Sequence, residues 1–138
     1  MTNTDYAGYL IDLDGTVYRG RDRMPEAKDF IERLQAKQIP FMFLTNNTTK
    51  SPAAVIQNLA DNHDIHATVD QVYTPSLATA RYLLNLNGGT ANGKTVYVIG
   101  ALGLKQARSD AGFRTNEFDP AYVVVGLDYD VTYHMFEL

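Results

Sequence analysis

The chain has 138 residues, of which 16 are acidic and 12 basic, so its formal charge is −4. With 45% apolar and 20% charged residues, it has the composition of a globular protein of one domain or slightly more, which excludes a disordered or fibrous chain. The acidic balance without a basic cluster argues against nucleic-acid binding, and no run approaches the roughly 20 apolar residues of a membrane span.

The absence of cysteine limits the chemistry that the chain can perform. It excludes disulfides, thiolate nucleophiles and Cys-ligated metal sites, so any metal must be held by oxygen or histidine ligands. The N-terminal residues also lack the basic start and apolar run of a signal peptide. We therefore expect a cytoplasmic protein with no membrane or nucleic-acid partner.

Apolar runs and helical spacing alternate along the chain. Short apolar runs predict five strands, at residues 9–13, 39–44, 71–74, 95–99 and 122–127. Apolar residues at helical spacing predict helices that start at Pro25, Pro52, Pro75 and Leu104, and a last helix that starts at Thr132. This alternation predicts an α/β fold with a parallel sheet, and the continuous apolar runs predict strands buried on both faces. A domain boundary is expected at the loop 87–94 or earlier, near Pro75.

Two carboxylates lie where the first predicted strand ends, in the sequence Asp12-Leu13-Asp14-Gly15-Thr16, and Asp14-Gly15 predicts a turn there. From typical residue usage, this pattern arises by chance in a chain of this length on the order of once in a thousand sequences. Carboxylates this close repel one another, and a hard divalent cation such as Mg²⁺ would relieve the repulsion. Two solvated aspartates are the plainer alternative. A calcium-binding EF-hand loop is excluded because it needs glycine at position 6 and glutamate at position 12, where this sequence has Val17 and Arg23.

The second predicted strand is followed by the polar residues Thr45, Asn46 and Asn47. In open α/β sheets, ligands bind beyond the carboxyl ends of the strands, so these residues and the aspartates are expected at one edge. Uncharged hydrogen-bond donors there could hold phosphoryl oxygens without changing the charge balance.

The stretches YLIDLDGTVYRG and IPFMFLTNNTTKSP make the sequence similar to the haloacid dehalogenase (HAD) superfamily, in its NagD-like branch. The similarity covers residues 6–138. It implies a Rossmann-like core whose N-terminal half spans residues 1–76, followed by an incomplete α/β cap domain at residues 77–138.

The resemblance also implies an activity and roles for the site residues. It implies a phosphatase of small phosphomonoesters, such as sugar phosphates or nucleoside monophosphates, with Asp12 as the nucleophile that forms an aspartyl-phosphate. Asp14 resembles the general acid and base, and Mg²⁺ would be bound by Asp12 and by the backbone carbonyl of Asp14. Thr45 resembles the hydroxyl that binds the phosphoryl group, with Asn46 and Asn47 lining the same loop.

The lysine and the further aspartates of the family's third and fourth motifs are not found in these 138 residues. We therefore expect a truncated chain, and a catalytically inactive remnant that binds phosphate or a partner is the alternative function. Phosphoryl transfer to an acceptor other than water is a third possibility. The resemblance also suggests a homodimer through the cap. The glycines of Gly100-Ala101-Leu102-Gly103 lack dinucleotide-binding spacing and are assigned a structural role.

Overall fold

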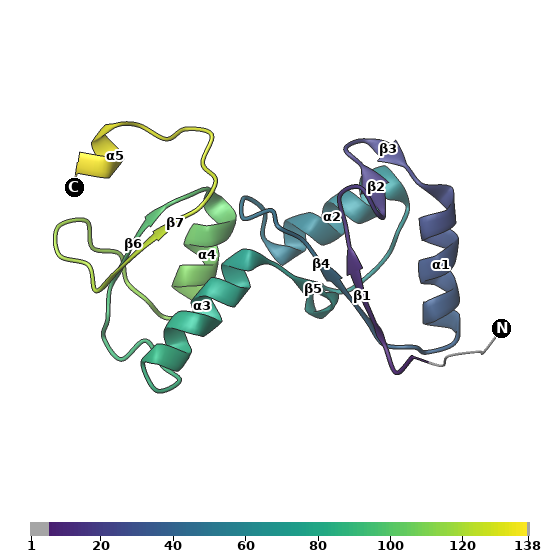
Figure 1. Ribbon diagram of the computed structural model, residues 1–138, viewed down its shortest axis with the longest axis horizontal. Coiled ribbons are helices and arrows are strands. Elements are labelled where there is room, and N and C mark those ends of the chain that lie inside the picture. The colour runs from purple at the N-terminus through teal and green to yellow at the C-terminus, as the bar shows by residue number, and fades with distance from the viewer. Residues whose placement is uncertain (1–5, 138) are drawn as a thin grey trace. The chain divides into compact units, whose positions relative to one another are not determined.

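The computed structural model describes residues 6–137, which form two compact units. The first unit contains residues 6–45 and 52–73, and the second contains residues 46–51 and 74–137. Figure 1 shows the strands and helices of each unit.

The first unit is a parallel sheet with helical connections. Its strands β1 (Tyr9–Asp12), β4 (Phe41–Leu44) and β5 (Val72–Tyr73) lie in the order β1-β4-β5. The connections contain α1 (Pro25–Ala36), α2 (Pro52–His63) and the 3₁₀ helix η1 (Val69–Gln71). Both strand pairs are parallel, which confirms the predicted α/β sheet.

One face of this sheet carries the core of the first unit. Register places Ile11, Phe43 and Val72 side by side on that face. They belong to one buried cluster with apolar residues of both helices, namely Ile31, Leu34, Val55 and Leu59. On the other face Leu10 is 73% exposed. The prediction that the first strand is buried on both faces is therefore wrong, because both helices of this unit cover the same face.

A short hairpin that the sequence did not predict follows β1. It pairs β2 (Tyr18–Arg19) with β3 (Asp22–Arg23) in antiparallel register. Each strand has two residues, and three of the four are charged, so neither strand shows the alternating apolar pattern that identifies strands in a sequence.

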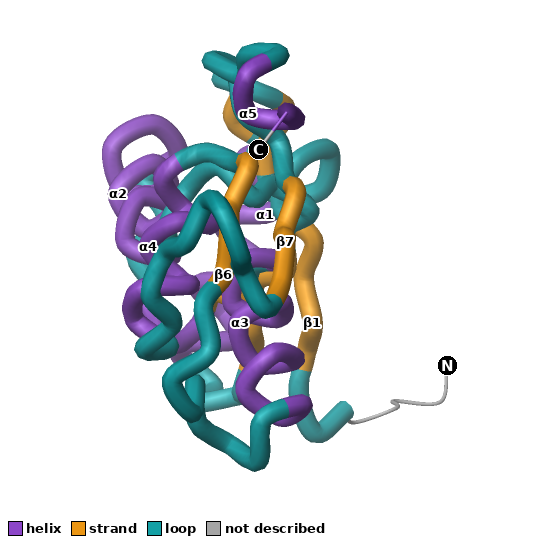
Figure 2. The backbone as a smooth tube through the Cα atoms, turned by 90° about the vertical axis from the view of Figure 1, so that its left-hand side faces the viewer, coloured by secondary structure: helices purple, strands orange, loops and turns teal. Residues whose placement is uncertain are grey.

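The second unit contains a smaller parallel sheet. Its strands β6 (Val96–Ile99) and β7 (Tyr122–Val125) lie side by side, as Figure 2 shows. Its helices are α3 (Pro75–Leu86), α4 (Leu102–Asp110) and α5 (His134–Glu137). The last helix begins two residues after Thr132, where the sequence predicted its start. Packing of Val96 against Leu83 and Phe113 forms the core of this unit.

The two compact units divide between Tyr73 and Thr74. The resemblance implied a boundary of core and cap between residues 76 and 77, and that assignment stays a prediction. Residues 46–51 also group with the second unit, although they follow β4 of the first. Local patterns do not reveal this grouping, because it depends on hydrogen bonds to residues that are distant in the sequence.

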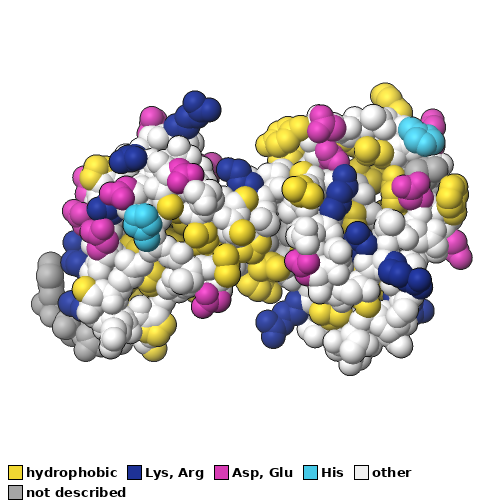
Figure 3. All heavy atoms as spheres, turned by 180° about the vertical axis from the view of Figure 1, so that it is seen from behind, with side chains coloured by type: hydrophobic (Ala, Val, Ile, Leu, Met, Phe, Trp, Pro, Cys, Tyr) yellow, Lys and Arg dark blue, Asp and Glu magenta, His cyan; other side chains and the backbone are white. Residues whose placement is uncertain are grey.

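Positive and negative side chains are mixed on the surface of the protein. On the face shown in Figure 3, lysine and arginine side chains are scattered among acidic and apolar ones and do not gather in one patch. Within residues 6–137, no helix has both the length and the apolar character needed to cross a bilayer.

Candidate functional site

The two aspartates lie at the carboxyl end of β1, where they are exposed. Asp12 is the last residue of the strand, and Asp14 lies in the turn that follows. Leu13 between them is fully buried in the core of the first unit. The buried leucine holds the chain against the core, so that the carboxylates on either side of it remain accessible.

The turn after Asp14 is built from local backbone contacts. The carbonyl of Leu13 accepts hydrogen bonds from the amides of Thr16 at 3.2 Å and Val17 at 2.8 Å. Gly15 has φ +87°, in the left-handed region where only glycine is unstrained. Val17 is buried at 1% exposure and closes the turn against the core. The sequence Asp14-Gly15 therefore predicted the turn correctly.

Each carboxylate has a hydrogen-bond donor within the same segment. The hydroxyl of Thr16 donates to Oδ2 of Asp12 at 3.4 Å, and the amide of Gly20 donates to Oδ1 of Asp14 at 3.2 Å. Burial raises the pKa of the Tyr18 hydroxyl, and the negative charges of Asp14 and Asp12 raise that pKa further. The two aspartates thus form a local negative field, which favours a cation or a proton donor beside them.

Thr45 reaches the same edge of the sheet from the neighbouring strand. Register pairs Asp12 with Leu44, and Thr45 is the next residue after Leu44. Because β1 and β4 are parallel, their carboxyl ends coincide, as the sequence predicted for this edge. The structure therefore brings together Asp12, Asp14 and Thr45 within the first unit.

Asn46 and Asn47 are exposed and belong to residues 46–51, which group with the second unit. Oδ1 of Asn47 accepts hydrogen bonds from the amide of Thr49 at 2.7 Å and from the hydroxyl of Thr49 at 2.6 Å. The side-chain oxygen of Asn47 thus shapes the loop itself. The site roles predicted for both asparagines remain predictions.

Three long-range hydrogen bonds hold the loop 46–51. The hydroxyl of Ser76 donates to the carbonyl of Thr48 at 3.1 Å, and the amide of Gly103 donates to the carbonyl of Thr49 at 3.1 Å. The amide of Leu127 donates to Oγ1 of Thr48 at 3.2 Å. These contacts explain why the loop groups with the second unit.

Gly103 allows the loop to approach α4 closely. A Cβ atom at this position would lie 2.7 Å from the carbonyl carbon and oxygen of Lys50 and 2.8 Å from the carbonyl oxygen of Thr48. Only a residue without a side chain fits at such a distance from backbone. A structural role was predicted for the glycines of 100–103, and this contact supplies the physical reason at Gly103.

The described residues do not provide a full set of metal ligands. No cluster of three or more His, Cys, Asp or Glu suited to a metal ion occurs within residues 6–137. Mg²⁺ often binds through one or two carboxylates and completes its coordination with water and substrate phosphate. The exposed carboxylate of Asp12 and the backbone carbonyl of Asp14 fit that mode of binding, but they do not form a closed protein cage.

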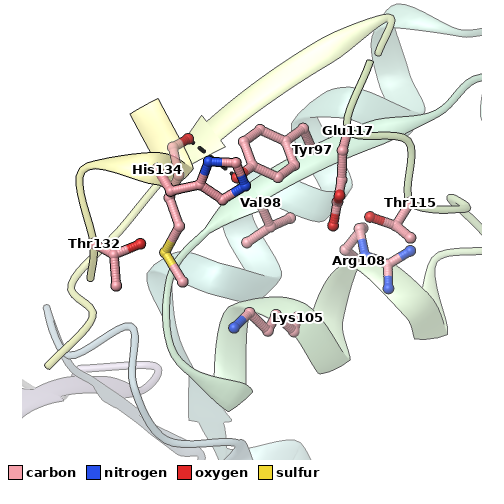
Figure 4. A pocket seen from close by; sticks show the side chains of 9 residues that line it. Tyr97, Val98, Lys105, Arg108, Thr115, Glu117, Thr132 and His134 are labelled. Atoms are coloured by element: carbon pink, nitrogen blue, oxygen red, sulfur yellow. Dashed lines mark hydrogen bonds between the residues drawn. The ribbon is translucent and has the colours of Figure 1, made fainter. Parts of the chain in front are cut away.

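The second unit also contains an open pocket of about 430 Å³, shown in Figure 4. Lys105 and Arg108 of α4 face this pocket, and the hydroxyl of Tyr97 donates to the carbonyl of Met135 at 3.1 Å. Both cations have protein partners: Nζ of Lys105 lies 4.0 Å from Asp128, and Arg108 donates to the carbonyl of Phe113. None of the five residues that the sequence predicted for the site lines this pocket.

Known proteins resemble this chain closely. Residues 9–114 match the family described as haloacid dehalogenase-like hydrolase. An acid sugar phosphatase from Staphylococcus epidermidis is 46% identical over 129 residues, which are 93% of this chain and 48% of the relative. The 5′-nucleotidase YutF from Bacillus subtilis is 40% identical over 131 residues, which are 95% of this chain and 49% of the relative.

The fold is also found in a solved structure. NagD from E. coli K-12 superimposes with a TM-score of 0.84 at 24% identity, over 95% of this chain and 50% of NagD. This likeness shows a common fold. The chain spans about half the length of the relatives that it matches. That share agrees with the expectation that two of the family's motifs are absent from these 138 residues.

Proposed function

The chain belongs to the haloacid dehalogenase-like hydrolases, and from that premise we propose that it carries the nucleophile and the acid–base group of a Mg²⁺-dependent phosphatase of small phosphomonoesters. The observation that supports this proposal most is the exposed pair Asp12 and Asp14 at the end of β1, with Thr45 following the neighbouring strand. This edge of a parallel sheet is where α/β proteins bind their ligands.

In the proposed reaction, a carboxylate oxygen of Asp12 attacks the phosphorus atom, and the bond from phosphorus to the ester oxygen breaks. Asp14, in its acid form, gives a proton to the leaving oxygen. Its carboxylate then takes a proton from the water that attacks the aspartyl-phosphate, which releases phosphate and restores both aspartates. The hydroxyl of Thr45 donates a hydrogen bond to a phosphoryl oxygen throughout.

The charges at this site require a counterion. A phosphomonoester brings about two negative charges to a site that already holds two carboxylates. Asp12 and the backbone carbonyl of Asp14 would hold Mg²⁺, which supplies positive charge beside the phosphoryl oxygens when it is bound. Substrates of the sugar phosphate or nucleoside monophosphate class are supported by the names of the two relatives. A cytoplasmic location and the absence of a nucleic-acid partner are part of the same proposal.

A catalytically inactive, phosphate-binding remnant is the second candidate function. It is favoured by the incomplete ligand set, since no group of three or more metal-binding side chains occurs among residues 6–137. Electrostatic stabilisation by a complete site supplies much of the rate enhancement of phosphoryl transfer. A remnant would bind inorganic phosphate without turning over esters.

The test measures hydrolysis of p-nitrophenyl phosphate with and without Mg²⁺, together with the intact mass of the purified protein. The phosphatase proposal expects Mg²⁺-dependent turnover that Asp12→Asn removes and that Asp29→Asn, an exposed acid on α1, leaves unchanged. Asp14→Asn is expected to lower kcat about 10²- to 10⁴-fold. Turnover that survives Asp12→Asn contradicts the proposal. Binding of inorganic phosphate by the wild-type protein without any turnover would support the inactive remnant instead.

A further inference from the structure

The hairpin β2–β3 is attached to Asp14 at its base. The amide of Gly15 donates to the carbonyl of Tyr18 at 2.6 Å, and Asp14 and Tyr18 form an isolated β-bridge. The amide of Gly20, in the turn of the hairpin, donates to Oδ1 of Asp14 at 3.2 Å. The direction of the Asp14 carboxylate therefore depends on where the hairpin lies.

The same hairpin is attached to the last turn of α2 at two points. The ring of Tyr18 stacks on the imidazole of His63, with ring centroids 4.3 Å apart and planes 12° from parallel. Nε of Arg23 donates to the carbonyl of Asn62 at 2.6 Å. His63 is 3% exposed, so the ring on which Tyr18 stacks is buried.

The hairpin needs such attachments because it has little stability of its own. Each strand has two residues, and an isolated two-stranded hairpin is at best marginally stable in water. Stacked aromatic pairs contribute beyond their buried area, and α2 packs on the sheet through Val55 and Leu59. The helix can therefore fix the hairpin, and through Gly20 the hairpin can fix the carboxylate of Asp14.

We propose that Tyr18, His63 and Arg23 are positioning residues that attach the hairpin to α2 and thereby hold the Asp14 carboxylate in a single orientation. This inference rests on the proposed function for the role of Asp14 in proton transfer. A general acid acts only within hydrogen-bond reach of its target atom, so a carboxylate held in one orientation is an advantage.

The experiment compares His63→Ala, His63→Phe and the control Phe30→Ala in the full chain. The ring of Phe30 contacts Tyr9 of β1 edge to face at 5.4 Å, and Arg33 of α1 lies over it at 5.9 Å. The readouts are hydrogen exchange of the Gly15 and Gly20 amides, corrected for global unfolding, and the carboxyl ¹³C shift of Asp14 at neutral pH. Neither readout requires turnover.

His63→Ala is expected to speed exchange at Gly15 and Gly20 about two- to tenfold, as the loss of a stacked pair implies, and to move the Asp14 carboxyl signal. His63→Phe, which keeps a ring in the stack, should restore both values, and Phe30→Ala should change neither. Arg23→Met removes the second attachment, and because Arg23 is exposed the change leaves the core intact. It should also speed exchange at Gly15 and Gly20, so it tests the proposal even if His63→Ala fails to fold.

Equal effects of His63→Ala and Phe30→Ala would overturn the proposal, as would unchanged exchange and carboxyl signals in both His63→Ala and Arg23→Met. The two proposals fail separately. If Asp14→Asn leaves turnover intact while the exchange results hold, the catalytic role of Asp14 is wrong and the attachment of the hairpin stands.

Discussion

The two loops at the carboxyl edge of the first sheet are held in different ways. The turn after β1 is closed by bonds to the carbonyl of Leu13 from residues three to five positions further along the chain. The loop after β4 is held by contacts to Ser76, Gly103 and Leu127, and its bond from Leu127 spans 79 residues of sequence. A locally closed loop can be predicted from its own residues, whereas a loop held from a distance depends on the folding of another unit.

The largest effect is expected at the distant contact of Gly103. Gly103→Ala places a Cβ atom 2.7 Å from the backbone of Lys50, so the loop or the helix must move. We expect the free energy of unfolding of the second unit to fall by about 3 kcal/mol, at the upper end of the usual range for overpacking. Chemical denaturation checks this, and amide exchange should rise at residues 46–51 but not at residues 14–17. An equal rise in amide exchange in both loops would show that the two loops are not held independently.

The corresponding change in the locally closed turn is Gly15→Ala. No atom lies within 4 Å of the position that its Cβ would occupy, so the only penalty is the left-handed φ of +87°. We expect a loss of about 1–2 kcal/mol in the stability of the first unit, which denaturant unfolding measures. Gly15→Asn should recover part of the loss, because asparagine tolerates this backbone region better than alanine does. A loss as large as that of Gly103→Ala would show that the turn is tightly packed.

A smaller effect is expected from the single side-chain contact of Thr48. Thr48→Val keeps the shape of the side chain but removes the oxygen that accepts the amide of Leu127. The expected loss is about 1 kcal/mol in the second unit, measured by denaturant unfolding. Thr48→Ser retains the acceptor and serves as the control. If valine and serine behave alike, this hydrogen bond does not hold the loop.

The smallest effect is expected from a surface ion pair of the first unit. Nζ of Lys28 lies 2.9 Å from Glu32 and 3.4 Å from Asp64. The hydrogen bond and charge of Lys28 hold the pKa of Asp64 below its ordinary value of 3.8. This contribution to stability is therefore present above pH 3.8 and is lost as the pH falls through the lower pKa of the folded state.

Lys28→Met should lower stability slightly at neutral pH and leave it nearly unchanged at pH 2, so the acid side of the stability–pH curve becomes flatter. Lys94→Met, in the second unit, is the matched control. An acid curve that Lys28→Met leaves unaltered would mean that water screens this pair completely. Thermal unfolding between pH 2 and pH 6 provides the measurement.

Much of the fold could be predicted because its signals are local. The apolar runs before Asp14 and before Thr45 identified β1 and β4, and the prolines at positions 25, 52 and 75 marked the starts of three helices. The alternation of the two kinds of element then fixed the parallel pairing, which the register confirms. The meeting of Asp12 and Thr45 at one edge followed from that pairing.

The remaining features depend on contacts that no local pattern records. The hairpin that carries Tyr18 is too short and too polar to show a strand pattern. The stacking of Tyr18 on His63 joins residues that are far apart in the sequence, so no local pattern identifies His63. The exposure of Leu10 depends on which face the helices cover, and an apolar run alone does not specify that face.

The central claim is that Asp12 accepts the phosphoryl group, and trapping that group tests it most directly. The intact mass of the protein at its natural length is measured first. The protein is then mixed with p-nitrophenyl phosphate and Mg²⁺ and quenched in acid, and its peptides are analysed by mass spectrometry. The account predicts one phosphoryl group on the peptide that contains Asp12, more of it in Asp14→Asn, and none in Asp12→Asn. Release of p-nitrophenol from the wild type and from Asp14→Asn with no phosphoryl group on that peptide in either would contradict the account.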